Sequence, residues 1–419
     1  MVVISLGTNL GNRLDNLSNV VSKISQRCLK NLRSSIVLET DAIVPEGAPE
    51  SWNIPYLNMI VSGTSHLSPH DLLHELKLIE REIGRPEIYD RWSPRIIDLD
   101  ILLYDDLRIS EDHLTIPHKE LNNRPFFLHL LALMNISPWS EQFEFKNTFT
   151  KTFSLDPKFV GVVNITEDSF SDGGKYQNIE EACRQIVKLN QDGAAIIELG
   201  AQSTKAGAKI LSIDEEYRKL DEVLIAAKSF VDANKIKISV DTYNADVALK
   251  LLQKHNISMI NNVGNMFDDN ALKAISEAKC DLCFVHSLNA PVVKENVMKS
   301  PTVVQDLIDW RDRCVDKFIS VGFDESRLVF DTGIGFGKTS YQSLNILKNL
   351  QYLRSDSCKL MIGHSRKSFI RAFSDEKIAA NRDLETIAIS QEIFDHADFV
   401  RVHNVKDNMK SAVVHQLLK

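Results

Sequence analysis

The chain has 419 residues, of which 43% are hydrophobic and 25% charged, and its formal net charge at pH 7 is −8. This composition is typical of a soluble globular protein, and the length predicts two domains or one large barrel with an appended domain. An acidic chain without a long apolar segment is not expected to bind nucleic acid or a membrane. The short first apolar run predicts a strand, not a signal peptide, so we expect a cytoplasmic protein.

The first part of the chain predicts a β-α-β-β-α-β order of elements. Strands are expected at residues 2–7, 36–40, 56–62 and 97–103, and helices at residues 14–27 and 69–83. This order is that of an α+β ferredoxin-like fold. The segment 41–55 is irregular and rich in Pro and Gly, which predicts a loop.

Two carboxylates are predicted to share one face of the last of these strands. Asp98 and Asp100 alternate with apolar residues, and two residues of a strand span roughly 6.6 Å, so both can reach one site. A divalent cation would remove the repulsion between them. With Arg91, Arg95 and Trp92 just before, the stretch predicts a metal-bound nucleotide polyphosphate. The alternative is a solvated strand face with incidental acids.

Two other spacings give weaker signals. Cys280 and Cys283 have no second pair to complete a metal site and lead into an apolar run, so we interpret them as buried reduced thiols. His70 and His74 lie four residues apart in a predicted helix. No glutamate completes a zinc-protease motif there, which favours a polar helix face.

Residues 1–138 contain the motifs Gly7–Gly11, Tyr56–Asn58, Glu80–Arg85, Arg91–Asp100, Pro117–His118 and Arg124–Phe126. Through these motifs, this part of the chain resembles hydroxymethyldihydropterin pyrophosphokinase. The resemblance implies that Asp98 and Asp100 hold two magnesium ions on ATP. It further implies catalytic and ATP-binding roles for Arg85 and Arg95, ATP contacts for Trp92 and His118, and pterin contacts for Asn58 and Phe126. From the residues alone, His118 could instead cap a turn.

Residues 139–155 lose periodicity and are expected to form a linker, and residues 156–419 predict a (β/α)8 TIM barrel. Eight short apolar runs alternate there with helical patterns. They occupy residues 159–165, 195–199, 236–240, 259–263, 282–285, 328–330, 360–362 and 399–402. The segment is close to the ~250 residues typical of this barrel.

Polar residues stand at or just past the carboxyl ends of these runs, where barrel enzymes keep their active sites. They are Asn164, Glu198, Asp241, Asn261, His286, Asp331, Ser365, Arg366, Lys367, Arg401 and His403. The basic residues among them follow the last two strands, which predicts an anion site against Arg366, Lys367, Arg401 and His403. Residues 332–339 resemble a phosphate-binding loop, but Thr332 replaces its first glycine, so we expect an ordinary barrel loop.

Residues 156–419 contain the motifs Val163–Gly174, Ser239–Thr242, Asp331–Lys338, Ser365–Ser368 and Arg401–His403. Through these motifs, this part of the chain resembles dihydropteroate synthase. The resemblance implies that the pterin is held by Asp241, Asn261, Asp331 and Lys367. It implies that pyrophosphate is held by Arg401, His403 and, with magnesium, Asn164, and that Thr204, Phe336 and Ser368 shape the p-aminobenzoate site. Lys367 and Arg401 would be catalytic.

Together the two resemblances imply a bifunctional transferase of folate biosynthesis. ATP would pyrophosphorylate the hydroxymethyldihydropterin, and the pterin diphosphate would then condense with p-aminobenzoate. The expected cofactors are two magnesium ions with ATP and one with pyrophosphate. The expected partners are small molecules, with a homodimer through the barrel as the candidate assembly. The alternative from another class is a pterin-binding or regulatory scaffold with one decayed site.

Overall fold

The computed structural model describes residues 1–86, 90, 92–138, 149–165, 175–202, 210–264, 267–291, 293 and 296–419. The chain forms two compact units, one of residues 1–155 and 413–419 and one of residues 156–412. The limits predicted for the kinase domain, the linker and the synthase domain stay a prediction, since much of the linker lies outside the described residues. None of the helices in these ranges combines the length and the apolarity that crossing a bilayer requires.

In the first unit, strands and helices follow one another along the chain. They are β1 (Val2–Thr8), α1 (Arg13–Arg27), β2 (Lys30–Ser34), β3 (Val37–Thr40), η1 (Glu50–Trp52), β4 (Tyr56–Thr64), α2 (Pro69–Ile83), β5 (Asp98–Tyr104), β6 (Ile109–Ser110), β7 (Thr115–Ile116), α3 (Pro125–Leu133) and β8 (Lys151–Phe153). The main sheet has the order β5-β1-β4-β3-β8, and β2 also pairs with β4. β1 lies antiparallel to both β4 and β5.

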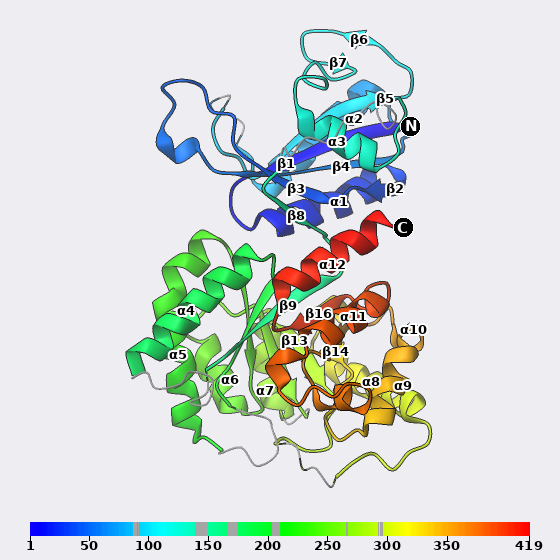
Figure 1. The fold of residues 1–419 in the computed structure, drawn as a ribbon. Helices are drawn as coiled ribbons and strands as arrows, with labels where there is room; N and C mark the ends of the chain where they lie inside the picture. The colour runs from blue at the N-terminus through cyan, green and yellow to red at the C-terminus, as the bar shows by residue number, and fades with distance from the viewer. Residues whose placement is uncertain are drawn as a thin grey trace. The chain divides into compact units, whose positions relative to one another are not determined.

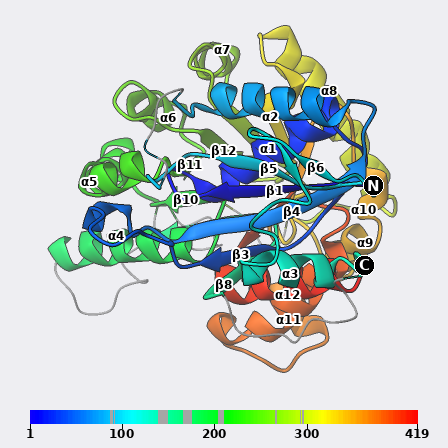
Figure 2. The same ribbon diagram turned by 90° about the horizontal axis from the view of Figure 1, so that it is seen from above.

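This arrangement confirms the ferredoxin-like prediction, and it adds β2, η1, β6, β7, α3 and β8, which were not predicted. β2 precedes the strand predicted at residues 36–40, and β8, inside the expected linker, pairs with β3. α1 lies beside α2 (Figure 2), and both contact the sheet. α3 instead packs Phe127 and Leu130 against Val3 and Ile60 in a separate cluster. Because side chains alternate along a strand, these two sets of contacts use opposite faces of the sheet.

Local signals explain where α2 begins and ends. The side chain of Ser68 accepts a hydrogen bond from the Asp71 N–H, and Pro69 occupies the first turn. Both residues stabilise a helix start. Gly84 ends the helix at φ 105°, a left-handed conformation that glycine adopts without a Cβ penalty. The helix therefore stops just before Arg85, which turns back toward β5.

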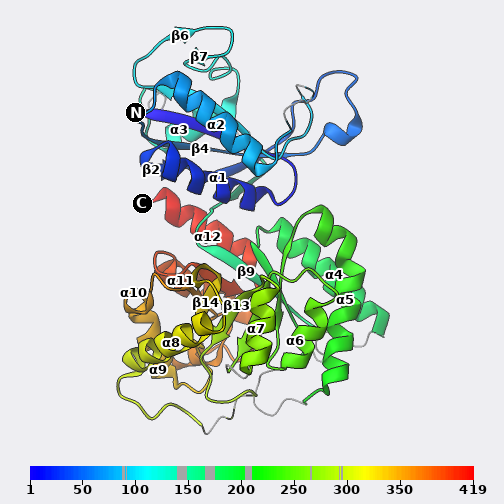
Figure 3. The same cartoon turned by 180° about the vertical axis from the view of Figure 1, so that it is seen from behind.

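The second unit is a closed barrel of parallel strands with helices outside (Figures 1 and 3), which confirms the TIM-barrel prediction. Its strands are β9 (Lys158–Asn164), β10 (Ile196–Gly200), β11 (Lys237–Asp241), β12 (Met259–Val263), β13 (Asp281–Val285), β14 (Leu328–Asp331), β15 (Lys359–Ile362) and β16 (Phe399–Val402). Its helices are α4 (Lys175–Gln191), α5 (Ile213–Ala233), α6 (Ala245–Leu252), α7 (Asp269–Glu277), α8 (Val303–Ser320), α9 (Ser340–Lys348), α10 (Leu350–Leu353), α11 (Asp383–Ile393) and α12 (Val405–Leu417), with 3-10 turns η4 (Glu325–Arg327), η5 (Ser368–Ala372) and η6 (Ala379–Asn381).

The strand register brings polar residues of neighbouring strands to one level. Asn164 of β9 and Asp241 of β11 both lie opposite Gly200 of β10, and Asn261 of β12 lies opposite Asp241. A Cβ on Gly200 would lie 3.6 Å from Asp241 Oδ2 and 3.9 Å from Asn164 Oδ1. Glycine therefore keeps a gap between two polar side chains at the carboxyl end of the barrel.

Candidate active sites

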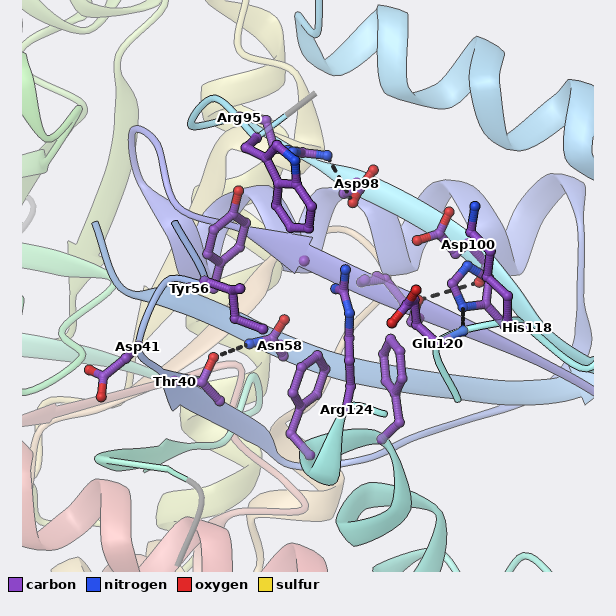
Figure 4. A pocket seen from close by; sticks show the side chains of 18 of the residues that line it. Thr40, Asp41, Tyr56, Asn58, Arg95, Asp98, Asp100, His118, Glu120 and Arg124 are labelled. Carbon is purple, nitrogen blue, oxygen red and sulfur yellow. Dashed lines mark hydrogen bonds and ion pairs between the residues drawn. The ribbon is translucent and has the colours of Figure 1, made fainter. Parts of the chain in front are cut away.

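A cavity of about 400 Å³ lies in the first unit, over strands β1, β4 and β5. Figure 4 shows side chains from these strands and from the segments around Arg95 and His118 lining it. All eight residues that the sequence predicted for the kinase half line this one cavity. They are Asn58, Arg85, Trp92, Arg95, Asp98, Asp100, His118 and Phe126. Arg91 lies outside the described residues.

The aspartate pair lies on the floor of this cavity. Asp98 stands opposite Gly7 of β1 and Asp100 opposite Ser5, so the two carboxylates occupy one face of β5. A Cβ on Gly7 would lie 3.4 Å from Asn58 Oδ1 and 4.0 Å from the Asp98 Cβ. The glycine thus leaves open the space between the aspartate and the amide.

Arginines hold one aspartate charged. Arg85 Nη1 lies 2.6 Å from Asp98 Oδ1, and Arg95 Nη1 lies 3.2 Å from Asp98 Oδ2. Burial would raise the pKa of Asp98, but the charges of Arg95 and Arg85 outweigh it and lower that pKa. The pKa of Asp100 is raised, first by burial and then by the Asp98 carboxylate. The two acids therefore differ in environment although they share one strand face.

These two carboxylates suit magnesium better than a metal ion whose ligands all come from the protein. Within the described ranges, no group of three or more His, Cys, Asp or Glu residues is arranged to hold a metal ion. Mg²⁺ commonly takes one or two carboxylates and completes its shell with water and substrate phosphates. Asp98 and Asp100 could therefore hold magnesium together with a nucleotide.

Aromatic and amide groups line the other end of the cavity. Asn58 is buried, and its Nδ2 donates to Thr40 Oγ1 at 2.9 Å, as Figure 4 shows. The rings of Phe126 and Phe127 lie 4.4 Å apart. Tyr56 also lines the cavity, and burial raises its pKa. A flat heterocycle could stack on these rings while its edge bonds the amide.

His118 both caps a turn and lines the cavity. Its Nδ1 accepts a hydrogen bond from the Glu120 N–H at 3.3 Å, as a turn-capping residue would. The side chain also lines the cavity near Asp100. Burial lowers the pKa of His118, and the charge of Asp100 partly opposes that effect.

The carboxyl end of the barrel holds a shared arginine. Arg401 Nη1 lies 3.1 Å from Glu198 Oε1, and Arg401 Nη2 lies 2.6 Å from Asp331 Oδ2. Burial lowers the pKa of Arg401, but the charges of Glu198 and Asp331 outweigh it, so that pKa is raised. One guanidinium thus compensates two carboxylates that are 3% and 0% exposed. The sequence placed Glu198 at a strand end without a role, so its contact with Arg401 was missed.

Lys367 lies beside an aromatic ring in the same region. Its Nζ donates to the Ile334 carbonyl at 2.5 Å and lies 4.2 Å from the centroid of the Phe336 ring. Burial lowers the pKa of Lys367 to about 7. The ammonium is therefore only marginally charged near neutral pH and would gain from an anionic neighbour.

Two buried polar side chains of the barrel have atoms without a hydrogen-bond partner among the described residues. These atoms are Nδ2 and Oδ1 of Asn261 and Oδ1 of Asp241. Burial raises the pKa of Asp241 to about 8, with the charge of Glu198 adding to it. Buried polar groups are nearly always bonded, so these atoms point to a polar ligand.

Not all of the basic residues join this cluster. His403 Nδ1 lies 2.9 Å from Ser365 Oγ. Arg366, at φ 59°, forms two hydrogen bonds with Asp383 at 2.7 and 2.8 Å. The anion contact expected for Arg366 stays a prediction. Asn164 is exposed at the end of β9, and Ser368 is exposed where η5 begins. Thr204 lies outside the described residues.

The loop after β14 confirms that the resemblance to a phosphate-binding loop is misleading. Gly333, Gly335 and Gly337 all have positive φ, which allows a tight turn. Lys338, near its end, is buried and lies 2.9 Å from His286 Nδ1, and it donates at 3.1 Å to the carbonyls of Gly333 and Phe336. The Lys338 ammonium therefore bonds carbonyls of its own loop, and these contacts were not predicted from the sequence.

The chain matches two known families in succession. Residues 3–138 match 7,8-dihydro-6-hydroxymethylpterin-pyrophosphokinase, and residues 160–403 match the pterin binding enzymes. A folate synthesis bifunctional protein of Chlamydia caviae is 32% identical, with 98% of this chain and 96% of the relative covered. One of Arabidopsis thaliana is 30% identical over 98% of this chain and 94% of its own length.

Solved structures extend the likeness of the barrel. A dihydropteroate synthase of Clostridium difficile, determined with pteroic acid, has a TM-score of 0.58 and 30% identity, covering 64% of this chain and 98% of its own. One of Anaplasma phagocytophilum with bound 6-hydroxymethylpterin-monophosphate has a TM-score of 0.56 and 28% identity, covering 63% and 100%. The chain therefore belongs to the family of folate synthesis bifunctional proteins, in which a pyrophosphokinase domain precedes a pterin-binding synthase barrel.

Proposed function

We propose that the chain catalyses two consecutive transfers in folate synthesis. The first half pyrophosphorylates 6-hydroxymethyl-7,8-dihydropterin with ATP, releasing AMP. The second half condenses the pterin diphosphate with p-aminobenzoate to 7,8-dihydropteroate, releasing pyrophosphate. The observation that carries this proposal is the presence in one chain of two anion-handling sites, the aspartate and arginine cavity and the Arg401 cluster, each beside groups that suit a pterin.

In the first transfer, the hydroxymethyl oxygen attacks the β-phosphorus of ATP as the bond from that phosphorus to the α-phosphate oxygen breaks. AMP leaves with the bridging oxygen, and the hydroxyl proton is lost to solvent. Asp98 and Asp100 would hold two magnesium ions, which when bound neutralise charge on the phosphates. Arg85 and Arg95 contact the transferring phosphates, with Trp92 and His118 also at the nucleotide. Asn58 and Phe126 orient the pterin, so that its hydroxyl meets the phosphorus in line.

In the second transfer, the amine nitrogen of p-aminobenzoate bonds to the pterin methylene as the carbon–oxygen bond to the diphosphate breaks. The amine proton is lost to solvent. Lys367, Arg401 and His403 stabilise the charge on the departing pyrophosphate, and Asn164 would hold one magnesium ion with it. Asp241, Asn261 and Asp331 bind the polar edge of the pterin, while Phe336, Ser368 and Thr204 shape the p-aminobenzoate site. No covalent enzyme intermediate is needed.

The buried atoms of Asn261 and Asp241 support the assignment of the pterin. A pterin ring presents donors and acceptors along one edge, which could satisfy these atoms together. The competing scaffold hypothesis does not require charged residues in both sites. Asp98, Asp100 and Arg401 weigh against it, because burying ionisable groups, even paired ones, has a desolvation cost that a scaffold has no reason to bear.

A coupled assay tests the proposal. The full chain is mixed with magnesium, ATP, 6-hydroxymethyl-7,8-dihydropterin and p-aminobenzoate, and AMP, pyrophosphate and dihydropteroate are measured. We expect the three products in equal amounts. Pterin binding without AMP formation would instead favour the scaffold hypothesis.

Three further assignments also remain proposals. A homodimer through the barrel is testable by sedimentation, and the magnesium counts are testable by metal titration with a nonhydrolysable ATP analogue. The cytoplasmic location also stays a proposal, since a relative from Arabidopsis thaliana carries a mitochondrial label. Localisation of the tagged full chain would decide it.

A further inference from the structure

Two side chains of α2 occupy the free edge of the aspartate strand. β5 lies at one end of the sheet order and pairs with β1 on its inner side. On its outer side, Glu80 Oε1 accepts a hydrogen bond from the Leu99 N–H at 2.7 Å, and Lys77 Nζ donates to the Leu99 carbonyl at 3.0 Å. Lys77 and Glu80 thus bond both backbone groups of Leu99, as a neighbouring strand would.

The bonded residue is the one between the two aspartates. The Leu99 peptide groups link Asp98 to Asp100, so their orientation sets the separation and direction of both carboxylates. Lys77 Nζ and Glu80 Oε1 also pair with each other at 2.7 Å. The two side chains therefore form a closed set of contacts with Leu99 and limit its freedom on the side that β1 does not reach.

Glu80 also holds an arginine of the cavity. Arg85 Nη1 lies 2.9 Å from Glu80 Oε1 and 2.6 Å from Asp98 Oδ1. The same guanidinium nitrogen donates to the Ile97 carbonyl at 3.3 Å. Glu80 thus helps to fix the guanidinium of an arginine that bonds Asp98 and lines the cavity.

Packing alone does not account for a carboxylate here. Glu80 is 3% exposed, and burial raises its pKa although Lys77 and Arg85 oppose that effect. Leu76 and Ile79 of the same helix are completely buried and already hold it to the sheet. Burying an apolar side chain at this position would cost less free energy than burying a carboxylate. The charge is therefore better explained by what it bonds than by helix packing.

We infer that Lys77 and Glu80 are positioning residues for the kinase reaction. They act through the Leu99 peptide and through Arg85, and they keep Asp98 and Asp100 at the spacing that a phosphate-bound metal requires. This inference rests on the proposed function of the kinase half. Residues outside the metal shell that orient its ligands commonly contribute about 10- to 100-fold to metal affinity or activity.

The test compares Glu80→Gln and Lys77→Met with a control on the same helix. Gln keeps an acceptor for the Leu99 N–H but loses the charge that Lys77 and Arg85 contact. Glu82→Gln is the matched control, because Glu82 is 42% exposed and pairs with Lys23 and Arg27 on the surface. For each full chain, kinase kcat, the KM values, the half-saturating magnesium concentration, synthase kcat and Tm are measured.

We expect Glu80→Gln and Lys77→Met to lower kinase kcat about 10- to 100-fold and to raise the half-saturating magnesium concentration. The KM for the pterin and the synthase kcat should stay within about twofold, and Lys77→Arg should recover part of the lost rate. Glu82→Gln should match the wild type.

Three results would overturn the inference. The first is unchanged kcat and magnesium requirement in both variants. The second is a parallel loss of Tm, pterin affinity and kcat, which would show that the pair only holds the fold together. The third is a wild-type chain that forms no AMP, which would remove the proposed kinase function and this inference with it.

Discussion

Replacing Arg401 by methionine is expected to destabilise the barrel unit strongly at alkaline pH. The substitution keeps much of the side-chain length but leaves Glu198 and Asp331, which are 3% and 0% exposed, without their shared cation. Removing one partner of a buried ion pair typically costs about 3–5 kcal/mol. For a unit of this size, each kcal/mol corresponds to roughly 2–4 °C in Tm, which predicts a loss of about 6–20 °C.

The loss should depend on pH in a defined direction. Burial already raises the pKa of Glu198, and removing Arg401 removes the charge that lowers it. A group whose folded pKa is raised above its unfolded value destabilises the fold as pH rises through the folded pKa. At low pH the carboxyl is protonated in both states, and the penalty disappears. The Tm difference between variant and wild type should therefore be larger at pH 8 than at pH 5.

The assay is thermal unfolding of the full chain at pH 5 and pH 8, with kinase activity as an internal check on the other unit. Arg366→Met is the matched control, because Arg366 pairs with Asp383 at the same end of the barrel but both side chains are about a quarter exposed. An exposed ion pair contributes about 0–1 kcal/mol, so its Tm should change little. Equal Tm values for Arg401→Met and the control, or a loss independent of pH, would refute the reasoning.

Three further outcomes are expected. Asp98→Ala should abolish AMP formation while the synthase half still converts supplied pterin diphosphate, and retained AMP formation would reject the metal assignment. The pKa of Lys367 is lowered to about 7, so its ammonium loses a proton as pH rises, and synthase kcat/KM for the pterin diphosphate should fall above that pH. Lys367→Arg should remove this pH dependence. A Lys367→Arg pH profile equal to that of the wild type would contradict the assignment. Asn58→Leu should raise the kinase KM for the pterin about 10-fold or more, because one or more hydrogen bonds to its edge are lost; equal KM values would place the pterin elsewhere.

Local periodicity was enough to predict the aspartate face. Alternation along β5 depends only on neighbours in the chain, so the shared face of Asp98 and Asp100 follows from their spacing. The contact of Glu80 with Leu99 does not follow from residue spacing, because it depends on how α2 packs against the sheet. β2 and β8 were missed for the same reason, since each is short and gains its hydrogen bonds from a partner distant in the chain.

In the barrel too, local patterns could be predicted from the sequence and long-range contacts could not. Its strand ends could be found from apolar runs, and the polar residues after them could be assigned to one end of the barrel. Which of them meet depends on register and on backbone conformation. Arg366 and Lys367 are adjacent in the sequence, yet Arg366 bonds Asp383 and Lys367 lies beside Phe336. The contact of Arg401 with Glu198 spans 203 residues, a separation at which spacing carries no information.

In each site one charged group proposed to bind substrate or its metal ion is already paired with opposite charges of the chain. Asp98 lies between Arg85 and Arg95, and Arg401 lies between Glu198 and Asp331. If these groups bind substrate, binding would exchange their partners. A guanidinium would turn from a carboxylate to a phosphate, and the released carboxylate would need a metal ion or a proton. Each buried charge is compensated before and after the exchange, which avoids the large cost of an unpaired ion. Neutralising one member should therefore damage the free protein as well as the reaction, so stability has to be measured before any lost activity is assigned to catalysis.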